Sequence, residues 1–188
     1  ETWTNLLRAA GASERLVDIL ETDSDINAPE NPAAMGKARG DVAFENVSFS
    51  YPTRPDDTAL EDISFFVTPG ETVALVGPSG AGKSTIFQLA ERFYDPQAGT
   101  IRLDGVALPS ADPAEIRRRM ALVPQEGVLF AADARDNLRY GKWDASDEDI
   151  WDAARHANAA EFLEKLPDGL DTSLGESGAR LSGGQQQR

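Results

Sequence analysis

The residues best suited to chemistry form a glycine-rich stretch that ends in a lysine and two hydroxyl side chains. Gly77 is followed after four residues by Gly82, Lys83 and Ser84. An apolar run after Glu71 precedes the stretch, and apolar residues at helical spacing follow it, so we expect strand, loop and helix in that order. The N–H groups of such a loop and the positive end of the helix attract an anion. The pattern therefore predicts a phosphate-binding loop.

A nucleotide explains the residue types within this loop. Lys83 would reach the β- and γ-phosphates, and the Ser84 hydroxyl would bind Mg²⁺. Glycine is required where a Cβ would meet the phosphates or forbid a positive φ. The alternative is a glycine-rich turn that merely joins a strand to a helix. The predicted nucleotide-binding residues of the loop are Gly77, Pro78, Ser79, Gly80, Ala81, Gly82, Lys83, Ser84 and Thr85.

Composition limits the class of protein and of partner. The 188 residues contain 40% hydrophobic and 27% charged residues, which is ordinary for a soluble globular protein. No apolar run reaches the length of a membrane span, and no signal peptide opens the chain. The chain has no cysteine, which excludes disulfides and fits a reducing compartment. A net charge of −14 argues against nucleic acid or an anionic lipid surface as the main partner.

The elements around the loop begin with β structure. Alternation over residues 42–51 predicts a strand whose phase slips at Glu45 and Asn46, so we expect a bulge there. Residues 63–67 predict the next strand, which leads by a turn into the loop. Asp104-Gly105 between two short apolar segments predicts a hairpin, and residues 121–123 predict a buried strand.

Helices are expected at the start and in the last third of the chain. Residues 3–21 read as an amphipathic helix, followed by a proline-rich linker over residues 27–36. Asp112 is expected to cap a short helix whose arginines 117–119 form a solvated face. Ser146 and Asn158 are expected to cap two further helices, the second ending at residues 167–169. His156, in the first of these two, is interpreted as a surface or packing residue.

A second glycine-rich segment gives the loop its context. The residues Leu181, Ser182, Gly183, Gly184 and Gln185 match the signature motif of ABC transporters, and Gly77 to Ser84 match Walker A. The sequence therefore resembles the nucleotide-binding domain of ABC transporters of the exporter type. Tyr51 matches the A-loop aromatic residue, Gln125 matches the Q-loop glutamine, and Gly175-Glu176 resembles an exporter-specific loop. These landmarks cover essentially the whole chain in the family's order.

The resemblance implies an α/β fold with a P-loop NTPase-like core, an antiparallel β subdomain and an α-helical subdomain. Residues 1–38 would be a helix and linker from an upstream transmembrane region. Residues 39–125 would form the β subdomain and the core up to the Q-loop, and residues 126–188 the helical subdomain. The C-terminal strands of the family's core sheet are expected to be missing, which would expose an unpaired edge and apolar surface.

The resemblance also implies a mechanism. Two such domains would pair head to tail, with ATP between Walker A of one and Leu181–Gln185 of the other. Tyr51 would stack on adenine, although it could also be only a strand-end aromatic residue. Gln125 would ligate Mg²⁺ with Ser84 and help to position the attacking water. The implied partners are a second nucleotide-binding domain and transmembrane domains, with no nucleic acid, at the cytoplasmic face of a cell membrane.

The sequence departs from the family pattern in one respect. No apolar run ending in two acidic residues was found in the chain, so the Walker B aspartate and catalytic glutamate are not identified. His156 precedes the signature and cannot be the switch histidine. We therefore expect no catalytic residue within this chain and deficient hydrolysis. Two alternatives to an exporter motor stay open: a nucleotide-binding switch or dimerisation module without turnover, and a soluble ABC ATPase of DNA repair or chromosome type. The transported substrate is not predicted.

Overall fold

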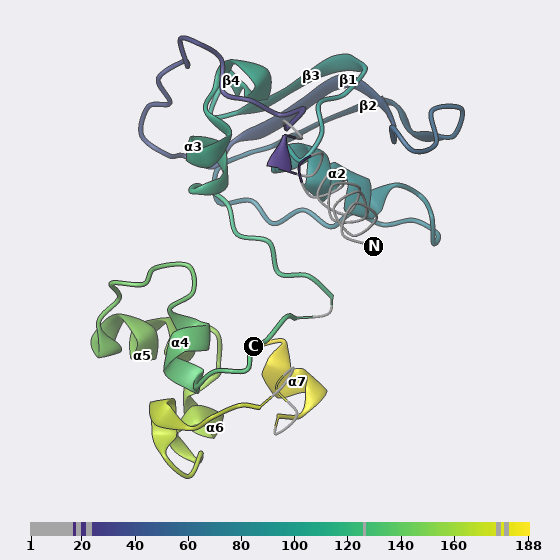
Figure 1. The fold of residues 1–188 in the computed structure, drawn as a ribbon. Coiled ribbons are helices and arrows are strands. Elements are labelled where there is room, and N and C mark those ends of the chain that lie inside the picture. Colours follow the sequence, from purple (N-terminus) through teal and green to yellow (C-terminus); the bar gives the residue numbers. More distant parts are fainter. Residues whose placement is uncertain (1–16, 18–19, 22–23, 126, 176–177, 179–180) are drawn as a thin grey trace, which may run out of the picture. The chain divides into compact units, whose positions relative to one another are not determined.

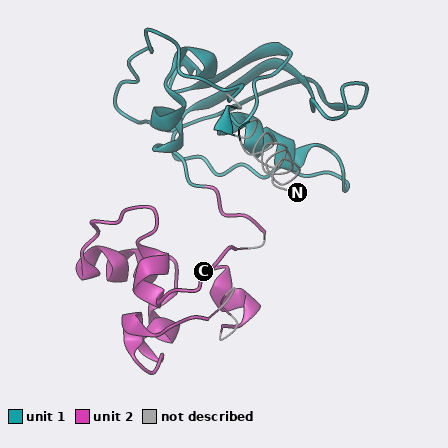
Figure 2. Ribbon diagram, in the orientation of Figure 1, with its two compact units in different colours: residues 1–121 teal, residues 122–188 magenta. Residues whose placement is uncertain are grey.

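The fold was analysed in a computed structural model, which describes residues 17, 20–21, 24–125, 127–175, 178 and 181–188. The helix predicted over residues 3–21 and the loop at Gly175-Glu176 lie largely outside these residues. The chain divides into two compact units, residues 1–121 and residues 122–188 (Figure 2). No helix in the described part is long and apolar enough to cross a membrane.

The first unit is an antiparallel sheet with a helix against one face (Figure 1). Its strands are β1 (Val42–Ser50), β2 (Thr58–Val67), β3 (Ala98–Leu103) and β4 (Val106–Ala107), in the spatial order β2-β1-β3-β4. Helix α2 (Lys83–Ala90) packs its buried Leu89 into the sheet's apolar core. The 3₁₀ helix η1 (Leu108–Ser110) and helix α3 (Pro113–Arg117) follow β4.

Three local predictions for this unit are confirmed. The β1 register shifts between Glu45 and Ser48 against β3, and Asn46 has a φ of 49°, so the expected bulge is present. Asp104 and Gly105 form the turn between β3 and β4, with φ angles of 52° and 80°. Asp112 caps α3 by accepting a hydrogen bond from the Ala114 N–H at 2.8 Å. The turn and the helix cap depend on residues close together in the chain, and the bulge lies where the alternation within β1 slips.

Two predicted strands are wrong. Neither the segment before the glycine loop, residues 71–76, nor residues 121–123 form strands. A strand needs a hydrogen-bonded neighbour, and no described residue pairs with either segment. Val76 and Val123 are 88% and 71% exposed. The expected apolar surface is therefore present, and part of it lines a hollow of about 250 Å³ between the sheet and α2.

The second unit is helical. It contains α4 (Ala134–Leu138), α5 (Asp147–His156), α6 (Ala160–Glu164), the 3₁₀ helix η2 (Gly169–Asp171) and α7 (Gly183–Gln186). Ser146 caps α5 as predicted, with a reciprocal hydrogen bond to Asp149. His156 lies at the surface, in agreement with its interpretation as a surface or packing residue.

Three predictions for the helical stretches need correction. Asn158 does not cap α6: its φ of 55° places it in the turn after α5, and the cap position is Ala159. The helix also ends at Glu164, before the expected stop. Arg119 does not belong to a solvated face, because its side chain is 11% exposed and pairs with Asp104 and Glu115. A long arginine side chain can reach distant carboxylates that helix periodicity does not reveal.

Asp104 joins the segment directly before β1 to the β3–β4 hairpin. Its Oδ1 accepts hydrogen bonds from the N–H groups of Arg39, Gly40 and Asp41, and its Oδ2 pairs with Arg119 at 3.1 Å. Burial alone would raise the pKa of the Asp104 carboxyl, but the hydrogen bonds from Gly40, Arg39, Arg119 and Asp41 lower it below its ordinary value. The ionised carboxylate therefore stabilises the fold.

The variant Asp104→Asn tests this contact, because asparagine has the same shape and tolerates the positive φ. The ionised form stabilises fully above the unfolded pKa of about 4, and this contribution is lost as pH falls through the lower folded pKa. We expect the variant to lower the free energy of unfolding by about 1–3 kcal/mol at pH 7. In urea denaturation the difference from wild type should shrink below about pH 4, whereas exposed Asp56→Asn should have little effect. A difference that stays constant to pH 2 would contradict this assignment.

Candidate functional site

The glycine loop is placed by the close approach of its last glycine to β2. Gly82 has a φ of 76° and occupies the cap position before α2. A Cβ at this position would lie 2.6 Å from the Ala59 carbonyl oxygen and 2.6 Å from Leu60 Cδ2. Gly80 also has a positive φ, 84°, but open space surrounds it. Glycine at position 82 thus allows the helix to begin directly against the sheet.

Lys83 folds over the loop that precedes it. Its Nζ donates to the carbonyl oxygens of Gly77 at 3.0 Å and Pro78 at 2.8 Å. The salt bridges found among the described residues include none with Lys83, so its charge is not neutralised there by a carboxylate. A cation held only by neutral carbonyls at the start of a helix is suited to an anionic ligand.

The other residues of the loop are accessible except at one position. Pro78, Ser79, Gly80 and Ala81 are exposed, as is the Ser84 side chain in the first turn of α2. Thr85 is 5% exposed and points into the unit. Residues 77–84 therefore form an accessible loop and helix start. Thr85 is buried on the inner side of the helix.

Tyr51 lies behind the same helix. Its hydroxyl lies 2.9 Å from Thr85 Oγ1 and donates to Gln88 Oε1 at 2.8 Å. The ring meets those of Phe49 and Tyr94 in edge arrangements, with centroids 5.0 and 5.5 Å away. The predicted adenine-stacking residue is thus tied to the helix that follows the phosphate loop. The contact between Gln88 and Tyr51 was not predicted from the sequence. Gln88 is a single polar residue within the apolar run Ile86–Ala90, and this could have indicated a buried hydrogen bond.

The predicted signature and Gln125 belong to the second unit. Ser182, Gly183 and Gly184 are exposed, and the Gln185 side chain accepts a hydrogen bond from the Ser182 N–H at 2.9 Å. Leu181 packs against that unit's core, and the Gln186 side chain donates to the Gly178 carbonyl. Gln125 is exposed. Leu181 thus anchors this segment in the unit's core, and Ser182, Gly183 and Gly184 are exposed to solvent.

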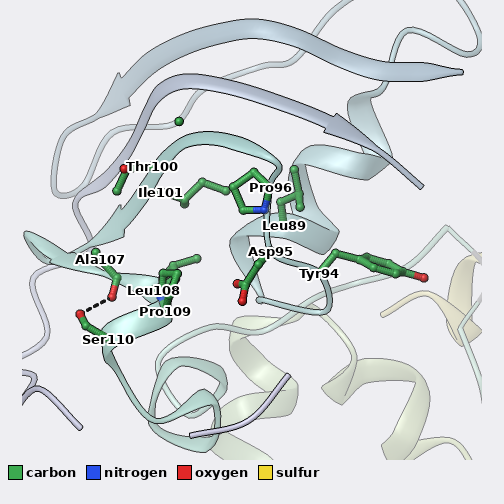
Figure 3. A pocket seen from close by; sticks show the side chains of 11 residues that line it. Leu89, Tyr94, Asp95, Pro96, Thr100, Ile101, Ala107, Leu108, Pro109 and Ser110 are labelled. Carbon is green, nitrogen blue, oxygen red and sulfur yellow. Dashed lines mark hydrogen bonds between the residues drawn. The ribbon is translucent and has the colours of Figure 1, made fainter. Parts of the chain in front are cut away.

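A further hollow, of about 240 Å³, lies between β3, η1 and the end of α2 (Figure 3). Its lining is mostly apolar, and the Asp95 carboxylate at its edge already pairs with Arg92 at 3.0 Å. None of the predicted site residues lines this hollow.

Comparison with known proteins gives consistent matches. A family model described as ABC transporter matches residues 60–188. The chain is 45% identical to ABC transporter B family member 21 of Arabidopsis thaliana, over 96% of this chain and 14% of that protein. It is 51% identical to the ATP-dependent lipid A-core flippase of Chromobacterium violaceum, over 85% of this chain and 27% of that protein.

Among solved structures, a bacterial Atm1-family ABC exporter with ATP bound matches with a TM-score of 0.87 and 37% identity. That match covers 98% of this chain and 32% of the exporter chain. The chain thus spans well under half the length of these three proteins, and the fold is that of an ABC exporter's α/β nucleotide-binding domain.

Two glycine substitutions test how the loop is held. Gly80→Ala should lower the free energy of unfolding by about 1–2 kcal/mol, the cost of a left-handed non-glycine residue. Gly82→Ala should cost about 1–3 kcal/mol more, because its Cβ also overlaps with Ala59 and Leu60. Urea denaturation of both variants measures the difference. Equal losses would show that the loop does not approach β2 so closely.

Proposed function

Because the chain belongs to the ABC transporter family, we propose that it is the ATP-binding motor domain of an exporter. The observation that carries this proposal is the glycine loop whose lysine lies on the loop's own carbonyls. The Ala81 N–H donates to the Pro78 carbonyl oxygen at 3.3 Å, whereas the first N–H groups of α2 have no partner within the helix and would be available to phosphate oxygens. The proposed ATP-binding residues are those predicted from the sequence, Tyr51 and Gly77–Thr85.

The residues of the loop fit a triphosphate. Lys83 would exchange the carbonyls of Gly77 and Pro78 for the β- and γ-phosphates, which form stronger, charge-assisted hydrogen bonds. A helix start with unpaired N–H groups adds a favourable field for the same charge. The global charge of −14 does not oppose this, because the local groups lie much closer to the phosphates.

Magnesium would enter with the nucleotide. The described residues contain no group of three acidic, histidine or cysteine side chains that could hold a metal. Mg²⁺ at such sites is bound largely by phosphate oxygens and water, with few protein ligands. The exposed Ser84 hydroxyl and the Gln125 side chain are the proposed protein ligands, and Gln125 would also help to position water.

The signature is proposed to act on the nucleotide of a partner. Ser182, Gly183 and Gly184 are exposed, so a second copy or a related domain can approach them. In the proposed head-to-tail pair, ATP lies between one domain's Gly77–Thr85 and the other's Leu181–Gln185. Closing and opening of the pair would drive substrate transport by transmembrane domains, which places this domain at the cytoplasmic face of a cell membrane.

A second candidate function is a nucleotide-binding switch or dimerisation module without hydrolysis. It is favoured by one observation: the 188 residues contain no identified apolar run that ends in two acidic residues. Positioning of phosphate without a group to orient water gives slow hydrolysis. We propose that the chain by itself binds ATP and is deficient in hydrolysis.

An ATPase assay separates the two functions. The 188-residue chain and a form extended by roughly a hundred residues, a domain-sized addition, would be compared under the same conditions. The motor function predicts turnover by the extended form and little by the chain alone. ATP binding with no turnover by either form would favour the switch.

Lys83→Ala tests the phosphate site. The loss of a charge-assisted contact should weaken ATP binding by about 10- to 100-fold. Titration calorimetry with Mg²⁺-ATP measures this, and the exposed Lys37→Ala is the control for loss of one positive charge. Unchanged ATP affinity in Lys83→Ala would refute the assignment of the loop.

Ser182→Arg tests the composite site. The exposed position accommodates the larger side chain in the single domain, so ATP affinity of the monomer should change by less than about twofold. ATP-induced pairing, followed by light scattering, should be lost, because the arginine would enter the partner's nucleotide site. Loss of ATP binding by the monomer itself would contradict the placement of ATP between two domains.

A further inference from the structure

We propose that Gln88 is a positioning residue for the nucleotide base, acting through Tyr51. The inference rests on the proposed ATP site and adds a residue outside the phosphate loop to it. Gln88 lies within α2, and its amide oxygen accepts the hydrogen bond that the Tyr51 hydroxyl donates, at 2.8 Å. This hydrogen bond joins two residues that both lie outside the loop Gly77–Thr85.

The direction of the hydrogen bonds around Tyr51 is determined by proton counting. A phenol has one proton, and Tyr51 gives it to Gln88 because the amide oxygen can only accept. Thr85 Oγ1, 2.9 Å away, must therefore donate its own proton to the Tyr51 oxygen. Thr85 and Gln88 are three residues apart in α2 and so lie on one helix face. The tip of the tyrosine is held at two points by one helix.

The ring is held along its sides as well. Phe49, which is 2% exposed, meets it at an interplanar angle of 77°, and Tyr94 meets it at 87°. Such edge arrangements favour a defined ring orientation. With its hydroxyl and two ring edges held, the Tyr51 side chain cannot move away from α2 without breaking both hydrogen bonds.

The consequence is a fixed relation between the base and the phosphates. Helix α2 begins at Lys83, so the helix that ends the phosphate loop also carries the groups that hold Tyr51. Along the chain, Tyr51 is separated from the loop by the whole of β2. A ring held in place before ATP arrives lowers the entropy cost of binding. Gln88 thus contributes to affinity for the base and not for the phosphates.

Gln88 can be replaced without disturbing the backbone. Its carbonyl oxygen accepts a hydrogen bond from the Phe93 N–H at 2.9 Å, which any residue at this position retains. Gln88→Met keeps the length of the side chain and loses the amide oxygen. Gln88→Glu keeps an acceptor for the tyrosine proton, and Tyr51→Phe removes that proton while keeping the ring.

The test compares two ligands, Mg²⁺-ATP and inorganic tripolyphosphate, by titration calorimetry on the full chain. The ratio of their affinities isolates the part of binding that depends on the base and sugar. Gln88→Met and Tyr51→Phe should each lower this ratio about three- to tenfold, the effect of one neutral hydrogen bond. The double variant should lower the ratio no further than Tyr51→Phe alone, because Tyr51→Phe already removes the hydroxyl that Gln88 holds, together with its contact to Thr85. Gln88→Glu should keep the wild-type ratio of affinities, because its carboxylate still accepts the tyrosine proton. Any repulsion between this carboxylate and the phosphates acts on both ligands.

Three results would overturn the inference: an unchanged ratio in Gln88→Met, an equal loss of affinity for both ligands, or effects that multiply in the double variant. A failure of the proposed function is recognised separately, because wild-type protein would then bind neither ligand. Thermal unfolding of each variant checks that the fold is retained, and Tyr51→Phe provides the second route to the same contact.

Discussion

The contact between Gly82 and β2 is the constraint on which the candidate site depends. The loop backbone comes so close to Ala59 and Leu60 that a single methyl group would not fit. The close approach allows α2 to begin at Lys83 with Leu89 buried in the sheet's core. The phosphate loop is therefore supported by the antiparallel sheet, even though the segment that leads into it is not a strand. A phosphate site needs N–H groups at fixed positions, and this contact supplies that rigidity.

The same helix organises the remainder of the site in the first unit. At its N-terminus it offers the lysine and serine expected to meet phosphate and Mg²⁺. One turn further along, its inner face holds the hydroxyl of Tyr51. Helix α3 is joined to the end of α2 by polar contacts as well. Arg117 donates to the carbonyl oxygens of Glu91 and Arg92, directly after α2. In the proposed site, one short helix would therefore relate the phosphate end of a nucleotide to its base.

Local sequence patterns predicted some of the turns and helix caps of the fold. They could not predict contacts between residues far apart in the chain. The turn at Asp104-Gly105 and the capping of α5 by Ser146 depend on residues within a few positions of each other. The strands expected at residues 71–76 and 121–123 depend on partners, and none is present among the described residues. The role of Arg119 and the link from Gln88 to Tyr51 join residues far apart in the chain. Neither periodicity nor motif spacing contains that information.

The central claim is that the chain binds ATP at the glycine loop. The most direct measurement is the change in backbone amide NMR shifts on addition of Mg²⁺-ATP. We expect the largest changes at Gly77 and at Ser79–Thr85, since Pro78 has no amide N–H, with further changes at Tyr51 and saturation with rising ATP concentration. Shifts confined to other parts of the chain, with Gly80, Gly82 and Lys83 unaffected at saturation, would contradict it.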